Sequence, residues 1–160
     1  MIGFKIDELM TGTHRFTDKP DTERPMLFSL TWGSDSLLKF LNPFSRNFLL
    51  SQATGFITVD GLVDKAECSG TLHLRYFSGR KIVYELFFQD EKGVNYRYVG
   101  EKLNLWPWNL YRTHFTCYGT ITDLSNDKVI SESIVYFPYR EIFPFVCSFR
   151  LRLGRVLKYS

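Results

Sequence analysis

Cysteine is scarce in this chain of 160 residues, and the three cysteines, Cys68, Cys117 and Cys147, stand far apart. The sequence has no CxxC pair and no cluster of His with Cys. It therefore offers neither the ligand spacing of a zinc site nor a disulfide framework. We expect no metal, and we predict free, buried thiols in a reducing compartment.

Long apolar runs are also missing, because no stretch approaches the roughly 18 uncharged residues of a membrane-spanning helix. Residues 1–10 carry Lys5, Asp7 and Glu8 where a signal peptide would be apolar. These features predict a cytoplasmic protein.

A large excess of one charge is absent too: 20 Lys and Arg stand against 17 Asp and Glu, a net charge of +3. This weak bias excludes a nucleic-acid-binding footprint over the whole surface, so we expect no nucleic-acid partner.

Motifs of cofactor binding and catalysis are lacking. The chain contains no GxGxxG, GxxxxGK[ST], HExxH or GxSxG. His14, His73 and His114 each stand alone in their segments, and the sequence nominates no partner that would make one of them a catalytic base. An enzyme that uses His73 or His114 with Glu85 or Glu101 has the least support. We therefore assign no catalytic residue and no cofactor.

Aromatic residues are the abundant class, with 15 Phe, 9 Tyr and 3 Trp among 44% apolar residues. Such rings either fill a sheet-based core or line a pocket, and composition does not distinguish the two. A chain of this length buries a core without staples. We predict one domain over residues 1–160.

Alternation of apolar and polar residues dominates from about residue 54 onward, which is typical of half-buried antiparallel strands. Strands are predicted at 26–32, 46–52, 54–60, 66–76, 80–89, 94–103, 111–122 and 129–137. A meander this long normally closes, because closure removes its exposed edges. The predicted fold class is therefore mainly β: an antiparallel meander that closes into a lipocalin-like β-barrel.

Two helices are predicted beside the strands. Ser34 or Asp35 would cap a short helix near 35–41, which Asn42-Pro43 would end. At the C-terminus, apolar residues recur at helical spacing and basic residues fall on the other side of the wheel. The apolar residues are Ile142, Phe145, Val146, Phe149, Leu153 and Val156; the basic ones are Arg140, Arg150, Arg152, Arg155 and Lys158. This helix would either cover the barrel or lie on an anionic membrane surface.

The densest aromatic feature is the run Trp106-Pro107-Trp108 between two predicted strands. Its rings would either gate the barrel mouth for an apolar ligand or plug that end as core. Tyr84 and Tyr96 would be wall residues of a ligand site, or part of a cross-strand ladder with other tyrosines. Arg112 or His114 would be the polar anchor of the ligand.

Several short segments occur in a particular order: 8–12, 25–28, 53–59, 84–86, 93–102, 111–113, 119–121 and 148–149. This order resembles the small β-rich accessory domain associated with bacterial glucose-methanol-choline (GMC) oxidoreductases of the cholesterol-oxidase-like group. The flavin-binding part of such enzymes has no counterpart here, so no catalytic residue carries over. The resemblance implies a stand-alone accessory domain, similar in outline to a lipocalin-like barrel, from a context of sterol and lipid oxidation.

Two functions follow from these observations. The first is a non-enzymatic module that binds a small apolar ligand, lipid or steroid-like, inside the barrel. The alternative is an accessory or interaction subunit of a separate oxidoreductase, with a barrel that side chains fill and no ligand.

Overall fold

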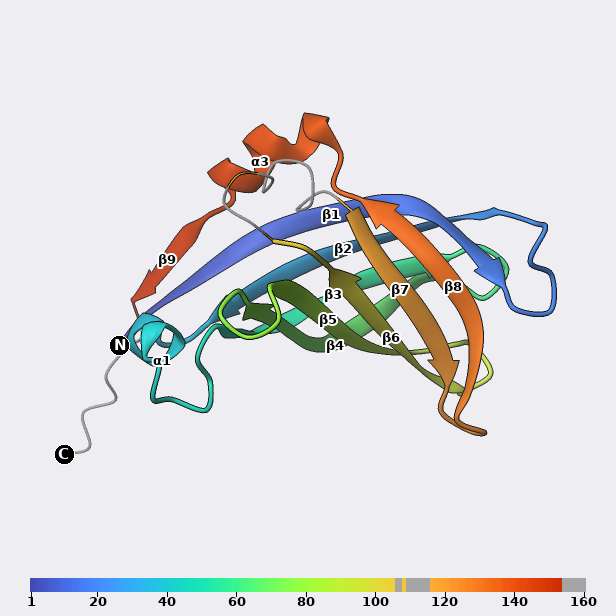
Figure 1. Ribbon diagram of the computed structural model, residues 1–160, viewed down its shortest axis with the longest axis horizontal. Helices are drawn as coiled ribbons and strands as arrows, with labels where there is room; N and C mark the ends of the chain where they lie inside the picture. Colours follow the sequence, from blue (N-terminus) through green and yellow to red (C-terminus); the bar gives the residue numbers. More distant parts are fainter. Residues whose placement is uncertain (106–107, 109–115, 154–160) are drawn as a thin grey trace.

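Eight antiparallel strands form a closed barrel in the computed structural model, which describes residues 1–105, 108 and 116–153 (Figure 1). Each strand pairs with the next, and β8 pairs back with β1, which closes the barrel. The mainly β, antiparallel, closed fold predicted from the alternation is confirmed. The strands are β1 (Ile2–Phe16), β2 (Arg24–Ser34), β3 (Leu50–Val59), β4 (Val63–Arg75), β5 (Lys81–Gln89), β6 (Asn95–Lys102), β7 (Thr116–Asp123) and β8 (Lys128–Tyr136).

The first strand of the barrel was not expected from the sequence. β1 pairs with β2 from Phe4 opposite Ser34 to His14 opposite Arg24, so it is one of the longest ladders of the sheet. Its residues alternate between the interior and the outside, but Glu8 occupies an interior position between apolar neighbours. A charged residue in the apolar series obscures the period-2 pattern.

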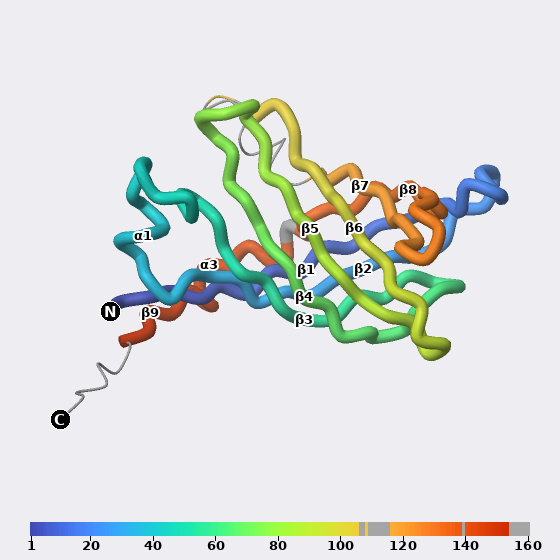
Figure 2. Tube along the Cα trace, turned by 90° about the horizontal axis from the view of Figure 1, so that it is seen from below, coloured from blue at the N-terminus to red at the C-terminus, as the bar shows by residue number. Residues whose placement is uncertain are grey.

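Successive connections of an antiparallel meander alternate between the two ends of the barrel. Each end therefore has its own set of connections. We call one the hairpin end; it holds the connections 17–23, 60–62, 90–94 and 124–127. We call the other the helical end; it holds the connections 35–49, 76–80 and 103–115 and the segment 137–153. Figure 2 shows α1 and β9 far from the β1–β2 connection, at opposite ends of the molecule.

The predicted short helix is present as α1 (Leu37–Leu41) in the connection from β2 to β3. Its cap is Ser36 rather than Ser34 or Asp35: the Ser36 hydroxyl oxygen accepts a hydrogen bond from the backbone N–H of Lys39 at 3.4 Å. A cap of this kind satisfies one of the N–H groups that a helix start leaves without a partner.

The predicted C-terminal covering helix is not confirmed. A 3-10 turn, η1 (Tyr139–Glu141), leads into α3 (Ile142–Cys147), which is only six residues long and buries none of them. The chain then extends as β9 (Arg150–Leu153), which pairs with residues 2–5 of β1. β8 covers only residues 11–16 of β1, so β9 provides backbone partners for an edge that would otherwise be open. Val156 lies outside the described residues.

Large side chains pack against glycines inside the barrel. Tyr98 of β6 lies over Gly100 and Gly119, and a Cβ atom at Gly119 would come within 2.3 Å of the Tyr98 ring. Such pairing of large with small residues fills the interior of a small barrel. The largest fully buried side chains are Tyr84, Tyr98, Phe28, Met10, Met26, Leu30, Ile57, Leu72, Leu86, Ile121, His14 and Val59. Part of the aromatic content therefore belongs to a packed core.

The three cysteines are free, as predicted. Cys68 and Cys117 are buried, but Cys147 is exposed, so the expectation of burial is wrong for Cys147. Cys147 ends α3, none of whose residues is fully buried.

Candidate functional site

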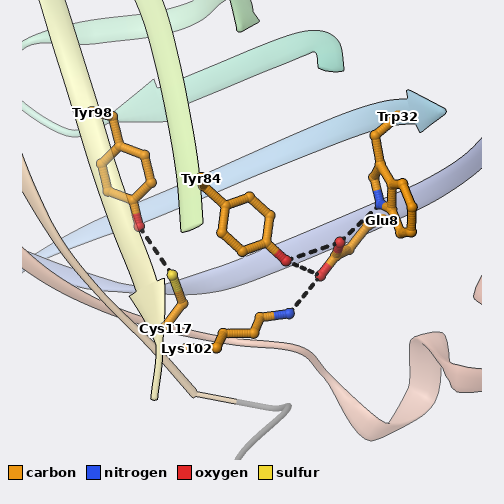
Figure 3. Close-up of polar contacts among 6 residues, drawn as sticks. All are labelled: Glu8, Trp32, Tyr84, Tyr98, Lys102 and Cys117. Atoms are coloured by element: carbon orange, nitrogen blue, oxygen red, sulfur yellow. Dashed lines mark hydrogen bonds and ion pairs between the residues drawn. The ribbon is translucent and has the colours of Figure 1, made fainter. Parts of the chain in front are cut away.

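Three side chains from three strands meet around the buried carboxylate of Glu8 on a fourth strand (Figure 3). We call Glu8, Trp32, Tyr84 and Lys102 the Glu8 cluster. The Lys102 ammonium lies 2.8 Å from Glu8 Oε1, and the Tyr84 hydroxyl donates to the same oxygen at 2.9 Å. The Trp32 Nε1–H donates to Glu8 Oε2 at 3.1 Å. The side chains of Glu8 and Lys102 are only 4% and 5% exposed, so the ion pair is screened from water.

The strand order explains how these residues meet. β1 and β5 lie on opposite walls of the closed eight-stranded barrel, so the Tyr84–Glu8 hydrogen bond crosses its interior. Trp32 reaches Glu8 from the neighbouring strand β2, and Lys102 reaches it from the last position of β6. Every member occupies an inward position of its strand, which fixes the direction of its side chain.

Burial shapes the protonation of the phenols near Glu8. Desolvation, followed by the Glu8 charge, raises the pKa of Tyr84 well above its usual value, so Tyr84 remains a hydrogen-bond donor. The same two causes raise the pKa of Tyr76, which begins the connection from β4 to β5. The Lys102 ammonium also lies 5.2 Å from the centre of the Tyr84 ring, within range of a cation–π contact.

A second ion pair, between β5 and β6, provides a comparison. Lys81 and Glu101 face outward, and their charged atoms are also 2.8 Å apart, but their side chains are 27% and 35% exposed. A partly exposed pair of this kind loses little hydration when it forms and contributes little to stability. Desolvation of a buried pair can exceed its Coulombic gain, so apolar residues would serve a barrel core as well as Glu8 and Lys102 do. The buried pair therefore calls for a reason other than stability.

The buried thiols do not extend the site toward covalent chemistry. Desolvation raises the pKa of Cys117 to about 11 and that of Cys68 to about 12, so both remain protonated near neutral pH. A protonated thiol is a poor nucleophile. The Cys117 sulfur lies 3.5 Å from the Tyr98 hydroxyl, and this contact extends the polar interior one step beyond the Glu8 cluster (Figure 3).

The structure brings one of the predicted ligand-binding residues to this cluster. Tyr84 belongs to it, whereas Tyr96 lies toward the hairpin end, where its hydroxyl donates to Asp90 at 3.2 Å and its ring stacks on Phe88. Trp108 is exposed. Three further predicted residues lie outside the described part of the chain: Trp106, Arg112 and His114.

Glu8, Trp32 and Lys102 were missed from the sequence. Lys102 follows Tyr96, Tyr98 and Gly100 at every second position of β6, so it continues the inward face of the strand. Glu8 continues the inward face of β1 in the same way. A charged residue in an apolar period-2 series was the available signal, because such a residue is buried only with a partner.

Aromatic side chains gather around the helical end of the barrel. The Trp32 ring lies 6.0 Å from that of Phe4, and Phe4 in turn contacts Phe40 of α1 at 4.9 Å. After β8, the Phe137 ring lies 5.3 Å from Phe145 of α3. Most of these rings are buried or half-buried, so the Glu8 cluster is bordered by apolar groups on this side.

Two hollows lined by described residues lie away from the Glu8 cluster. One of about 520 Å³ lies over outward-facing residues of β6, β7, β8 and β1, and one of about 690 Å³ lies at the hairpin end beside Asp60 and Asp90. Neither is lined by a member of the Glu8 cluster. Over the described ranges there is no group of three His, Cys, Asp or Glu side chains that could hold a metal ion.

No helix in the described part of the chain is long and apolar enough to cross a membrane. No protein-family model, no curated protein and no solved structure matches the chain. The chemistry of the Glu8 cluster is therefore the starting point for function.

Proposed function

We propose that the barrel is a non-enzymatic binding module for a small, mainly apolar ligand, lipid or steroid-like, whose polar group meets the Glu8 cluster. The observation that carries this proposal is the buried Glu8–Lys102 ion pair among apolar side chains. Ligand sites of this class are largely apolar and contain a few placed polar groups that fix orientation.

Under this proposal, the ligand binds toward the helical end of the barrel. Toward the hairpin end, the interior is filled by fully buried residues such as Met26, Ile57 and Ile121. Toward the helical end, the cluster is bordered by the ring of Phe4, which contacts Trp32. An ammonium carries three N–H donors and Glu8 accepts one, so Lys102 can also donate to a carboxylate or hydroxyl of the ligand.

Thermal shift and equilibrium binding with fatty acids, sterols and hydrocarbons without a polar group test this function. We expect ligands with a polar group to bind at least about tenfold more tightly, because they alone can bond to the cluster. The variant Glu8→Gln/Lys102→Met, which keeps side-chain volume and removes both charges, should lose that preference.

A matched control is Glu101→Gln/Lys81→Met, which makes the same changes in the outward pair on β5 and β6. This variant should bind as the unaltered protein does. A flat response across the whole panel, or equal losses in the two double variants, would contradict the proposed function.

A second candidate is an accessory subunit of a separate oxidoreductase, with a barrel that takes no ligand. The packing of Tyr98 on Gly100 and Gly119 favours it, because it leaves the middle of the barrel filled. In that case the outer surface is the functional part. Co-purification with a flavin oxidoreductase, unaffected by Glu8→Gln/Lys102→Met, would support this candidate, and recovery of the chain alone would count against it.

A further inference from the structure

The two ends of the barrel carry opposite charge. The four hairpin-end connections contain seven acidic residues and two basic ones, whereas the described part of the helical end contains six basic residues and two acidic ones. The acidic residues of the hairpin end are Asp18, Asp21, Glu23, Asp60, Asp90, Glu91 and Asp127. The basic residues of the helical end are Lys39, Arg46, Arg80, Arg140, Arg150 and Arg152.

Exposed apolar side chains follow the same division. At the helical end, Phe44 beyond α1 is 96% exposed and Phe143 in α3 is 78% exposed. Other exposed apolar residues at this end are Leu38, Leu41, Phe77, Leu103, Trp108, Ile142, Val146, Phe149, Leu151 and Leu153. In the hairpin-end connections, all of which are described, Leu124 is the one exposed large apolar residue. So many exposed apolar groups at one end mark an interaction surface.

We propose that the helical end docks on the surface of an anionic lipid bilayer. The exposed Phe and Leu side chains would enter the interfacial layer, and the basic side chains would meet lipid phosphates. The acidic hairpin end would face away, because an anionic surface repels it. Arg150 also pairs with Asp7 at 3.1 Å, so Arg140 and Arg152 are the clearer contributors of positive charge.

The distribution of these groups favours a membrane over a single protein groove. They lie on α1 and its following loop, on the connection from β4 to β5, on α3 and on β9, which are separate segments around one end of the barrel (Figure 1). Separate projecting segments of mixed apolar and basic character can contact a fluid surface together. Where this inference touches the proposed function, it adds that the ligand-binding end would face the bilayer, which is a source of apolar molecules.

Vesicle co-sedimentation tests the inference directly. The full chain is mixed with vesicles of phosphatidylcholine alone, or of phosphatidylcholine with about 30% phosphatidylserine to reproduce an anionic leaflet. We expect binding to the anionic vesicles that weakens at high salt, since screening removes the electrostatic part. Absence of binding to the anionic vesicles would overturn the inference, and a stable dimer without vesicle binding would assign the surface to a second copy of the chain.

Charge-reversal variants at the two ends separate this inference from general stickiness. Arg140→Glu/Arg152→Glu should reduce binding to anionic vesicles at least about tenfold, because each basic group near an anionic surface contributes favourably. Lys19→Glu/Lys92→Glu makes the same charge change at the hairpin end and should leave binding nearly unchanged. Equal losses in both variants would overturn the inference.

The apolar contribution is tested with Phe44→Ser/Phe143→Ser, which alters two exposed side chains and spares the core. This variant should bind vesicles several-fold more weakly and unfold at the same temperature as the unaltered protein, whereas unchanged vesicle binding would overturn the apolar part of the inference. Glu8→Gln/Lys102→Met should bind vesicles normally. Loss of ligand preference and loss of vesicle binding are therefore distinguishable failures.

Discussion

At the scale of single residues, Glu8 and Lys102 are the most unusual pair in the barrel. They lie 2.8 Å apart and are almost fully buried, and the Tyr84 hydroxyl and the Trp32 indole N–H complete the hydrogen bonding of the carboxylate. Removal of one partner from a buried pair leaves an uncompensated charge in a medium that solvates it poorly. The stability of the protein should therefore depend on each partner far more than on the pair as a whole.

The variant Lys102→Met is expected to lower the free energy of unfolding by about 3 kcal/mol, because Glu8 stays buried without its ammonium partner. Urea unfolding at neutral pH measures this change. The control Lys81→Met removes the same group from the outward pair and should cost no more than about 1 kcal/mol. Similar losses in the two variants would show that burial of the inner pair has no energetic consequence.

His14 is the residue that should make stability depend on pH. Its side chain is buried, with Nε2–H donating to the Asp60 carbonyl and Nδ1 close to the Ser131 hydroxyl, both at 2.9 Å. Desolvation lowers the pKa of His14 below its usual 6.5, so the folded state holds the neutral form. The unfolded chain then binds more protons, and the stability present above pH 6.5 is lost as the pH falls below that value.

Urea unfolding of the unaltered protein and of His14→Gln between about pH 7 and pH 5 tests this dependence. We expect the free energy of unfolding to fall more steeply on acidification when His14 is present, because glutamine does not titrate. Parallel curves for the two proteins would contradict a neutral, buried His14.

At the scale of elements, the sequence predicted the strands whose inward positions are mostly apolar or small. β5 is such a strand, since Ile82, Tyr84, Leu86 and Phe88 alternate with exposed or half-buried residues. β1 was not predicted because Glu8 interrupts the apolar series of its inward positions. The residue at the centre of the candidate site is therefore also the reason that the strand was missed. The barrel could be predicted from a local period, but the cluster depends on contacts between strands that are distant in the sequence.

The C-terminal segment shows the opposite error. Apolar residues at 142–156 fit a helical period, yet the chain is extended from Arg150 to Leu153. The open edge of β1 decides this conformation, since it offers backbone partners that an isolated segment lacks. Residues 149–153 do alternate between apolar and basic, but so short a run does not reveal its partner strand, which is at the other end of the chain.

Packing between β6 and β7 gives a prediction at this scale. Gly119→Ala is expected to lower the free energy of unfolding by about 2 kcal/mol, because the new Cβ would collide with the Tyr98 ring. The change is measured by thermal and urea unfolding. In a Tyr98→Leu background the ring is gone, so the same alanine should cost much less. An equal cost in both backgrounds would contradict the close packing of ring and glycine.

At the scale of the whole molecule, the basic charge, the exposed apolar groups and the aromatic border of the Glu8 cluster all lie at the helical end. The helical end is basic and rich in exposed Phe and Leu, and the aromatic side chains beside the cluster lie toward it. The hairpin end is acidic and closed by short polar connections. A module that exchanges apolar ligands with an anionic membrane would have one basic, apolar end and one acidic end. A barrel without a membrane or ligand partner does not require this difference between its ends.

The most direct measurement of the proposed ligand site is the nuclear magnetic resonance of the Trp32 indole N–H, which donates to Glu8. Its signal is assigned by comparison with Trp32→Phe, and the ligand is the tightest binder of the fatty acid and sterol panel. A ligand whose polar group meets the cluster should shift this signal saturably, while signals from the hairpin end stay in place. An unmoved Trp32 signal at saturating ligand, or a panel without any binder, would contradict a ligand site at Glu8.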